Sequence, residues 1–196
     1  MARIAILASG GGSTAEAIIC ACRDGRIPAE PAVIIGNNSG AEVFARAARL
    51  QVPARHLSGH THPDAGALDA VILACLRETG VTHVVLAGYL KKLGPLTLSA
   101  FAGRIVNTHP ALLPAFGGRG MYGARVHQAV LEAGARFTGA TVHHVTVDYD
   151  AGPVIAQVQV PVHPGDTVDT LAARVHVAEC DLLVSALASL IAAGEA

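Results

Sequence analysis

The chain alternates short apolar runs with longer alanine-rich amphipathic stretches. The apolar runs include "RIAILAS", "PAVIIGN" and "THVVLAG", and helices are predicted between them at 13–24, 41–50 and 64–79, with a short strand near "VPARHL". Strands that alternate with helices favour right-handed βαβ crossovers and a parallel sheet. Because the strand runs are apolar throughout, we expect helices to cover both faces of that sheet. The pattern predicts an α/β chain with a Rossmann-like, three-layer architecture.

The pattern changes in the second half of the chain. "RIVNTH" predicts another strand, followed by a helix near 123–134, strands in "GATVHHVT" and "GPVIAQVQVPV", and a long helix from about Thr167, capped by Asp166 or Thr167. Only "VDYDAG" separates the last two strands, so we expect them to pair antiparallel. The 196 residues suit one domain. We predict a single domain over 1–196, with halves of about 1–100 and 101–196 and a mostly parallel sheet that has an antiparallel C-terminal extension.

The charge distribution favours a small-molecule partner. Net charge is -1, and no run of lysines or arginines could neutralise several phosphates of a nucleic acid. The four cysteines, at 20, 22, 75 and 180, form neither a CxxC pair nor a disulfide framework, and indicate reduced thiols. The first apolar run is too short for a signal peptide, and we expect no segment of membrane-spanning length. We therefore expect a cytoplasmic protein without a nucleic-acid or membrane partner.

Three glycines follow the first predicted strand in "ASGGGSTAEAI". Gly10, Gly11 and Gly12 expose backbone amides, and Ser13 and Thr14 add hydroxyl groups where the helix opens. Amides at a helix N-terminus bind anions, so we expect a phosphate here. The alternative is a plain tight turn in which Ser13 caps the helix.

The same loop satisfies the GxGxx(G/A) spacing of dinucleotide-binding folds through Gly10, Gly12 and Ala15. That fingerprint also needs an acidic residue at the end of the second strand, to hold the ribose. Here the second strand ends in "GNN", and Glu30 precedes it. The glycine loop therefore fits binding of a phosphate group better than the dinucleotide binding of a nicotinamide dehydrogenase.

Asn107 and His109 stand two residues apart in "RIVNTHP". Residues two apart in a strand face the same side, and open α/β sheets place ligands at the carboxyl ends of their strands. An amide N–H and a protonated imidazole aimed at one atom would stabilise an oxyanion formed on a carbonyl. The alternative is a structural histidine beside a turn asparagine.

Asp148 and Asp150 lie in a turn before Gly152 and Pro153. Such residues are ordinary in turns. However, a histidine that acts as an acid needs a carboxylate to raise its pKa and orient its ring. One of these two aspartates is therefore a candidate partner for His109.

The ten histidines do not form a metal-binding pattern. His56, His60 and His62 lie in a predicted loop without cysteines or paired carboxylates, and the neighbours His143 and His144 face opposite sides of a strand. We expect no metal site, and we expect His143 to face the interior. A serine hydrolase is excluded because the chain has no G-x-S-x-G motif.

At these residues the sequence resembles the folate-dependent formyltransferases, over nearly the whole chain. The resemblance lies in "SGGGS" at 9–13, "VVLAGYLKKLGP" at 84–95, "NTHPALLPAFGG" at 107–118 and "DYDAGPVIAQ" at 148–157. It implies that Asn107, His109 and Asp150 are the catalytic residues. It also implies transfer of a formyl group from 10-formyltetrahydrofolate to the amine of glycinamide ribonucleotide in purine biosynthesis, with no metal.

The resemblance also implies the ligand contacts. The first half would hold the nucleotide phosphate through Gly11, Gly12, Ser13 and Thr14, and Glu179 would contact a ribose hydroxyl. The folate would contact Leu86, Lys91, Leu93, His143 and Val147. Lys91 stands where an arginine is frequent, which keeps the charge but loses the bidentate fork. The implied partners are small molecules, for a monomer or a homodimer.

Other functions remain open at this point. A methionyl-tRNA formyltransferase would need a basic C-terminal domain, and a formyltetrahydrofolate deformylase would carry an extra N-terminal domain, so the length disfavours both. From a different class, a non-catalytic nucleotide sensor would bind its ligand without turnover.

Overall fold

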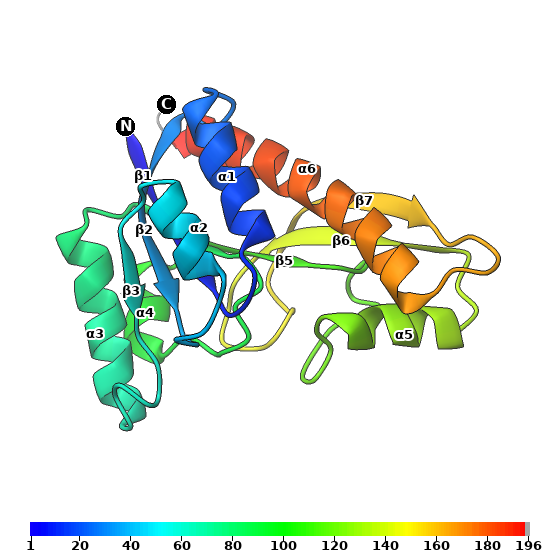
Figure 1. Ribbon diagram of the computed structural model, residues 1–196, viewed down its shortest axis with the longest axis horizontal. Helices are drawn as coiled ribbons and strands as arrows, with labels where there is room; N and C mark the ends of the chain where they lie inside the picture. Colours follow the sequence, from blue (N-terminus) through cyan, green and yellow to red (C-terminus); the bar gives the residue numbers. More distant parts are fainter. Residues whose placement is uncertain (195–196) are drawn as a thin grey trace. The chain divides into compact units, whose positions relative to one another are not determined.

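A computed structural model describes residues 1–194 of the 196-residue chain (Figure 1). Seven strands follow the hydrogen-bonding order β3-β2-β1-β4-β5-β6-β7. The contacts divide the chain into two compact units, which we call unit 1 (Met1–Val106 and the chain from Leu187 onward) and unit 2 (Asn107–Ala186). The prediction of a single domain over 1–196 stays a prediction, and its last two residues lie outside the described ones.

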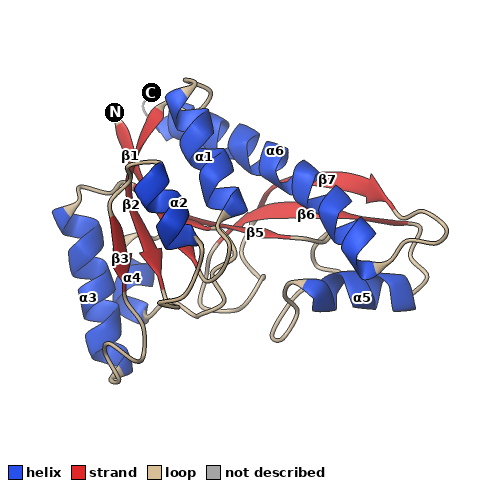
Figure 2. Cartoon of the chain, viewed as in Figure 1, coloured by secondary structure: helices blue, strands red, loops and turns tan. Residues whose placement is uncertain are grey.

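Unit 1 contains the parallel strands. Its elements are β1 (Ala2–Ala8), α1 (Ser13–Arg23), β2 (Ala29–Gly36), α2 (Val43–Arg49), β3 (Ala54–His56), α3 (Ala65–Glu78), β4 (His83–Leu86), α4 (Pro95–Ala100) and the first residues of β5 (Ile105–His109). β1 pairs in parallel with β2 and β4, and β2 pairs in parallel with β3. In Figure 2, α1 packs near α2 and α3 packs near α4, and these helices cover strands whose Ile4, Ile6 and Ile34 are fully buried.

Unit 2 contains the antiparallel pair. Its elements are the end of β5, α5 (Ala124–Glu132), β6 (Phe137–His144), β7 (Val154–Pro161) and most of α6 (Val168–Gly194). β6 and β7 run side by side, from Phe137 opposite Pro161 to His143 opposite Val154 (Figure 2). The buried residues Val130, Val160 and Leu171 form part of a core beneath α5 and α6.

The predicted α/β class is confirmed, including the mostly parallel sheet and its antiparallel C-terminal extension. Thr167 is the residue that caps α6, because its hydroxyl accepts a hydrogen bond from the Thr170 amide at 3.2 Å. The prediction omitted α4, since its six residues are too short to show helical periodicity. It also made α2 too long, because that helix begins at Val43 rather than at Ala41.

The expectation that no segment reaches membrane-spanning length is wrong for α6. This helix has 27 residues and contains an 18-residue window with a mean hydropathy of 1.7, so by length and composition alone it could cross a membrane. Its apolar residues also serve packing within the fold, because Leu171, Val175, Leu183 and Leu187 are fully buried. Because 28% of that apolar window is buried, part of the helix packs into the core.

Candidate active site

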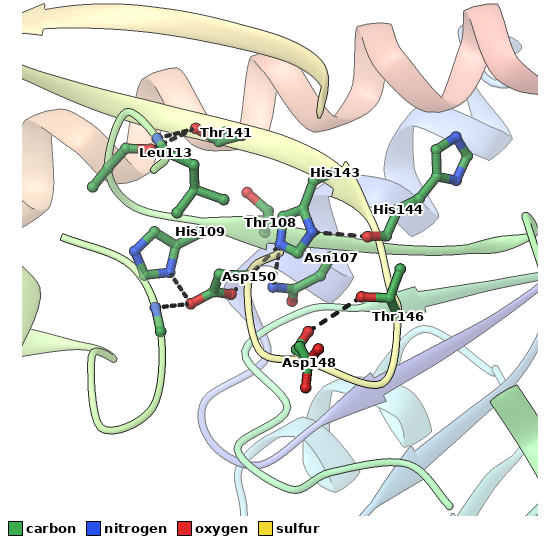
Figure 3. Close-up of polar contacts among 12 residues, drawn as sticks. Asn107, Thr108, His109, Leu113, Thr141, His143, His144, Thr146, Asp148 and Asp150 are labelled. Carbon is green, nitrogen blue, oxygen red and sulfur yellow. Dashed lines mark hydrogen bonds and ion pairs between the residues drawn. The ribbon is translucent and has the colours of Figure 1, made fainter. Parts of the chain in front are cut away.

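The three predicted catalytic residues lie together in unit 2 (Figure 3). Asn107 and His109 are on β5, and Asp150 is in the loop between β6 and β7. His109 Nδ1 is 3.6 Å from Asp150 Oδ2, and the His109 side chain is 4% exposed. A carboxylate at this distance, with little water around it, orients the imidazole.

The His109 ring faces an oxygen on each side. Opposite Asp150, its Nε2 donates a hydrogen bond to the backbone carbonyl of Phe116 at 2.8 Å. Each ring nitrogen of His109 therefore lies close to an oxygen. The imidazole N–H that we expect to bind an oxyanion is therefore already hydrogen-bonded to the backbone carbonyl of Phe116.

His143 connects the other two residues. Its Nε2 lies 3.6 Å from Asp150 Oδ1 and accepts a hydrogen bond from the Asn107 amide at 3.0 Å. Its Nδ1 donates to the carbonyl of His144 at 3.0 Å, which sets the orientation of the ring. His143 is 2% exposed, as expected from the strand pattern. Asp150 thus lies between two imidazoles (Figure 3).

Asp150 is held in its ionised form. Burial favours the neutral acid, but the close contact with the His143 imidazole, the hydrogen bond from the Gly118 amide and the nearby His109 imidazole lower the pKa of Asp150 overall. The Gly118 amide lies 2.8 Å from Asp150 Oδ2. The Asp150 backbone has a φ of 53°, a left-handed conformation that aspartate tolerates better than most residues.

The loop that carries Asp150 depends on Gly152. A Cβ at this position would lie 1.8 Å from the backbone oxygen of His144, so no other residue fits without moving the loop. The next residue closes the loop, because its carbonyl accepts a hydrogen bond from the His144 amide at 2.9 Å. Asp150 is therefore presented from a loop with a fixed base.

Thr141 supports the segment that follows His109. Its buried hydroxyl accepts hydrogen bonds from the Leu113 amide at 3.0 Å and from Gln157 Nε2 at 2.9 Å. It donates to the carbonyl of Ala111 at 2.6 Å. These contacts hold the chain between Pro110 and Pro114. The sequence analysis did not identify Thr141, because a threonine inside a β-rich run is expected for its β propensity alone.

Glu179, the predicted ribose contact, is oriented from two sides within unit 2. Thr108 Oγ1 donates to its Oε1 at 3.1 Å, and His176 Nδ1 lies 3.4 Å from its Oε2. Neither Thr108 nor His176 was predicted to take part. Two signals were available: Thr108 lies on the opposite face of the strand from Asn107 and His109, and His176 lies three positions before Glu179 on one helix.

The glycine loop lies in unit 1, where α1 begins at Ser13 as predicted. The residue at the N-cap is Gly12, with a φ of 80° and no side-chain cap, so Ser13 is not the cap. A Cβ on Gly12 would lie 2.6 Å from Val43 Cγ2, which also restricts this position to glycine. Arg46 Nε donates to the carbonyl of Gly11 at 2.7 Å and places a guanidinium beside the loop. The sequence contained no signal for this role of Arg46.

The remaining predicted ligand residues differ in exposure. Leu86 and Leu93 are buried in unit 1, and Val147 of unit 2 is 64% exposed. Lys91 lines a pocket of about 660 Å³ within unit 1. The other lining residues are Asn37, Asn38, Ser39, His56, Ser58, Gly59, His60, Ala65, Leu68, Asp69, Ile72, Tyr89, Lys92 and Gly94.

Among residues 1–194, no group of three or more histidine, cysteine or acidic side chains is arranged to hold a metal ion. His56 and His60 both line the unit 1 pocket, without a cysteine. The prediction that the reaction needs no metal stays a prediction.

Fold and site together describe an α/β protein in which a half-buried amide and carboxylate lie beside buried imidazoles. Residues 2–187 match the family model described as formyl transferase. The chain belongs to the formyl transferase family.

Relatives and solved structures agree with this assignment. The chain is 40% identical to phosphoribosylglycinamide formyltransferase, chloroplastic, of Arabidopsis thaliana, over 96% of its length and 65% of that protein. It is 37% identical to phosphoribosylglycinamide formyltransferase of Haemophilus influenzae, over 89% of its length and 80% of that protein. The crystal structure of glycinamide ribonucleotide transformylase 1 from Symbiobacterium toebii superposes with a TM-score of 0.92 at 41% identity, covering 99% of this chain and 89% of that one. The chain thus spans about two thirds of the plant relative.

Proposed function

We propose that the protein transfers the formyl group of 10-formyltetrahydrofolate to the amine of glycinamide ribonucleotide. The observation that carries this proposal is the position of Asp150, whose carboxylate lies 3.6 Å from both His109 and His143 beside the Asn107 amide. The matching relatives named for this activity support the choice of substrates. The proposed partners are therefore two small molecules.

The proposed reaction is a direct attack on the formyl carbon. A carbon–nitrogen bond forms to the ribonucleotide amine, and the bond to the folate nitrogen breaks. The negative charge that develops on the formyl oxygen meets the Asn107 amide and the cationic His109, which stabilise it more than they stabilise the neutral formyl group. Asp150 orients His109 and assists transfer of a proton from the attacking amine to the leaving nitrogen.

The contact between His109 and Phe116 must change during this reaction. His109 Nε2 donates to the Phe116 carbonyl, so that N–H reaches a substrate oxygen only after the carbonyl withdraws. Phe116 has a φ of 55°, an unfavourable value for a bulky residue. We therefore infer that the segment at Phe116 rearranges when the substrates bind.

The ligand contacts in this proposal follow the family. The phosphate binds the amides of Gly11 and Gly12 with the hydroxyls of Ser13 and Thr14, as expected at a helix N-terminus. Glu179, oriented by Thr108, accepts a hydrogen bond from a ribose hydroxyl. Leu86, Lys91, Leu93, His143 and Val147 contact the folate. A cytoplasmic location, a monomer or homodimer, and a mechanism without a metal belong to the same proposal.

The test is the turnover of 10-formyltetrahydrofolate, measured by the absorbance of the deformylated folate, with and without glycinamide ribonucleotide. Turnover that depends on the ribonucleotide supports the transferase. Release of formate without the ribonucleotide would identify a hydrolase instead. Ribonucleotide binding with no turnover at all would identify a nucleotide sensor.

A further inference from the structure

Helix α6 carries a cluster of reactive side chains that the proposed mechanism does not use. Cys180 Sγ lies 3.7 Å from His176 Nε2 and 3.9 Å from His176 Nδ1. His176 Nδ1 in turn lies 3.4 Å from Glu179 Oε2. These residues are three and four positions apart, so they share one side of the helix, which is orange to red in Figure 1. We call them the Cys180 cluster.

The contacts of the imidazole in this cluster favour its cationic form. Hydrogen bonding to the Cys180 sulfur and to the Glu179 carboxylate raises the pKa of His176 to about 10, although burial works in the opposite direction. A cation next to a cysteine stabilises the thiolate, which is the nucleophilic form of the side chain. The geometry therefore resembles the cysteine–histidine pairs that activate thiols in enzymes.

The other cysteines lack this environment. Burial raises the pKa of Cys22 to about 11, and burial also raises that of Cys75, despite the nearby charge of Arg55. Within residues 1–194, Cys180 is the one cysteine whose sulfur lies within hydrogen-bonding distance of an imidazole. Cys180 is only partly buried, and the His176 side chain is 40% exposed, so a small reagent can approach.

We propose that Cys180 is a peroxide-sensitive thiol whose modification weakens binding of the ribonucleotide through Glu179. The Cys180 thiolate attacks one oxygen of hydrogen peroxide, so that an S–O bond forms and the O–O bond breaks. The sulfur is oxidised to a sulfenic acid, and the departing hydroxide takes the proton from His176 to give water. The peroxide is the oxidant, and no other reactant is needed.

Modification reaches the substrate contact through two shared residues. His176 contacts both Cys180 and Glu179, and Glu179 is also bound by Thr108. A group added to the sulfur occupies the space beside the imidazole and takes away the negative charge that it faces. His176 then changes its contact with Glu179. This second half of the inference rests on the ribose role proposed for Glu179.

The reactivity is tested by labelling the full-length protein with limiting iodoacetamide at pH 7.5 and measuring the rate at each cysteine by peptide mass spectrometry. We expect Cys180 to react about tenfold faster than Cys22 or Cys75, as is usual for a thiol beside a cation. Treatment with hydrogen peroxide followed by dimedone should trap the sulfenic acid at Cys180. Equal rates at all cysteines would overturn the proposal.

Two substitutions at one position separate charge from structure. His176→Gln removes the cation and should slow labelling of Cys180 to the rate of the other cysteines. His176→Lys keeps a positive charge on the same side of the helix and should retain most of the fast rate. Fast labelling in His176→Gln would show that the imidazole does not activate the thiol.

The link to the substrate is tested by kinetics of the protein labelled at Cys180. We expect the KM for glycinamide ribonucleotide to rise about fivefold, the usual effect of weakening one hydrogen bond to a charged group, with kcat unchanged. Cys180→Ser should have normal turnover and resist both reagents. An unchanged KM after full labelling would overturn the link. A protein without turnover would refute the proposed function, while the labelling rates would still decide the reactivity.

Discussion

Asp150 and His109 face each other across 3.6 Å, from Oδ2 to Nδ1, in a part of unit 2 where little of either side chain is exposed. The same oxygen accepts a hydrogen bond from the Gly118 amide at 2.8 Å, which fixes the direction of the carboxylate. A charge held in this way acts on the imidazole without screening by water. The pair is therefore the part of the site where a single substitution should have the largest effect on the reaction.

Asp150→Asn should lower kcat by about 100-fold to 1000-fold, because it removes the negative charge that faces His109 and assists proton transfer. The fold should survive, since asparagine tolerates the left-handed backbone that this position requires. The measurement is steady-state kinetics, with circular dichroism as the check on folding. Asp148→Asn is the matched control, because Asp148 is exposed in the same turn and its contact with Thr146 is through the backbone carbonyl. Equal losses in both variants would contradict this role for Asp150.

The lowered pKa of Asp150 predicts a pH dependence of stability. A carboxyl group whose pKa is lower in the folded state stabilises the fold above its unfolded pKa of about 3.9, and this contribution is lost as the pH falls through the folded value. The wild type should therefore lose stability relative to Asp150→Asn as the pH falls from about 5 to 3. Urea unfolding at several pH values measures this difference. A difference that stays constant over this range would show that Asp150 has no shifted pKa.

Thr108→Val should raise the KM for glycinamide ribonucleotide about fivefold and leave kcat unchanged. The reason is that valine keeps the shape of the side chain but loses the hydrogen bond to Glu179, which is typically worth about 1 kcal/mol. The KM for the folate should not change, which serves as an internal control. A loss in kcat with an unaltered KM would instead place Thr108 in the chemical step.

The fold could be predicted from periodicity because the strands are uniformly apolar and the helices amphipathic. Most residues of β1 and β2 are buried, whichever face of the sheet they point to, as expected of strands that are covered on both faces. The prediction omitted α4, because six residues are too few to show helical periodicity. It also excluded any segment of membrane-spanning length, although α6 is long and apolar enough to be one. Length and composition alone do not distinguish a core helix from a spanning one.

The candidate site could be predicted only in part. Asn107 and His109 are two residues apart on one strand, so their common side follows from strand geometry. Asp150 lies 41 positions beyond His109 in an ordinary turn, and only the family resemblance selected it over Asp148. His176 contacts Glu179 and Cys180 within one helix, whereas Thr108 and Thr141 act through contacts that the folded chain creates between distant segments. No local pattern in the sequence encodes such contacts.

Thr141→Val should lower the free energy of unfolding by about 2 kcal/mol, because it leaves the buried Leu113 amide and Ala111 carbonyl without their partner. The loop before Pro114 should then loosen and kcat should fall with stability. Thr138→Val on the same strand is the matched control. Its hydroxyl is also buried but has no hydrogen-bond partner among the described residues, so removing it should be neutral or stabilising. Urea unfolding of both variants decides the matter, and equal destabilisation would mean that burial, not the Thr141 hydrogen bonds, supports the loop.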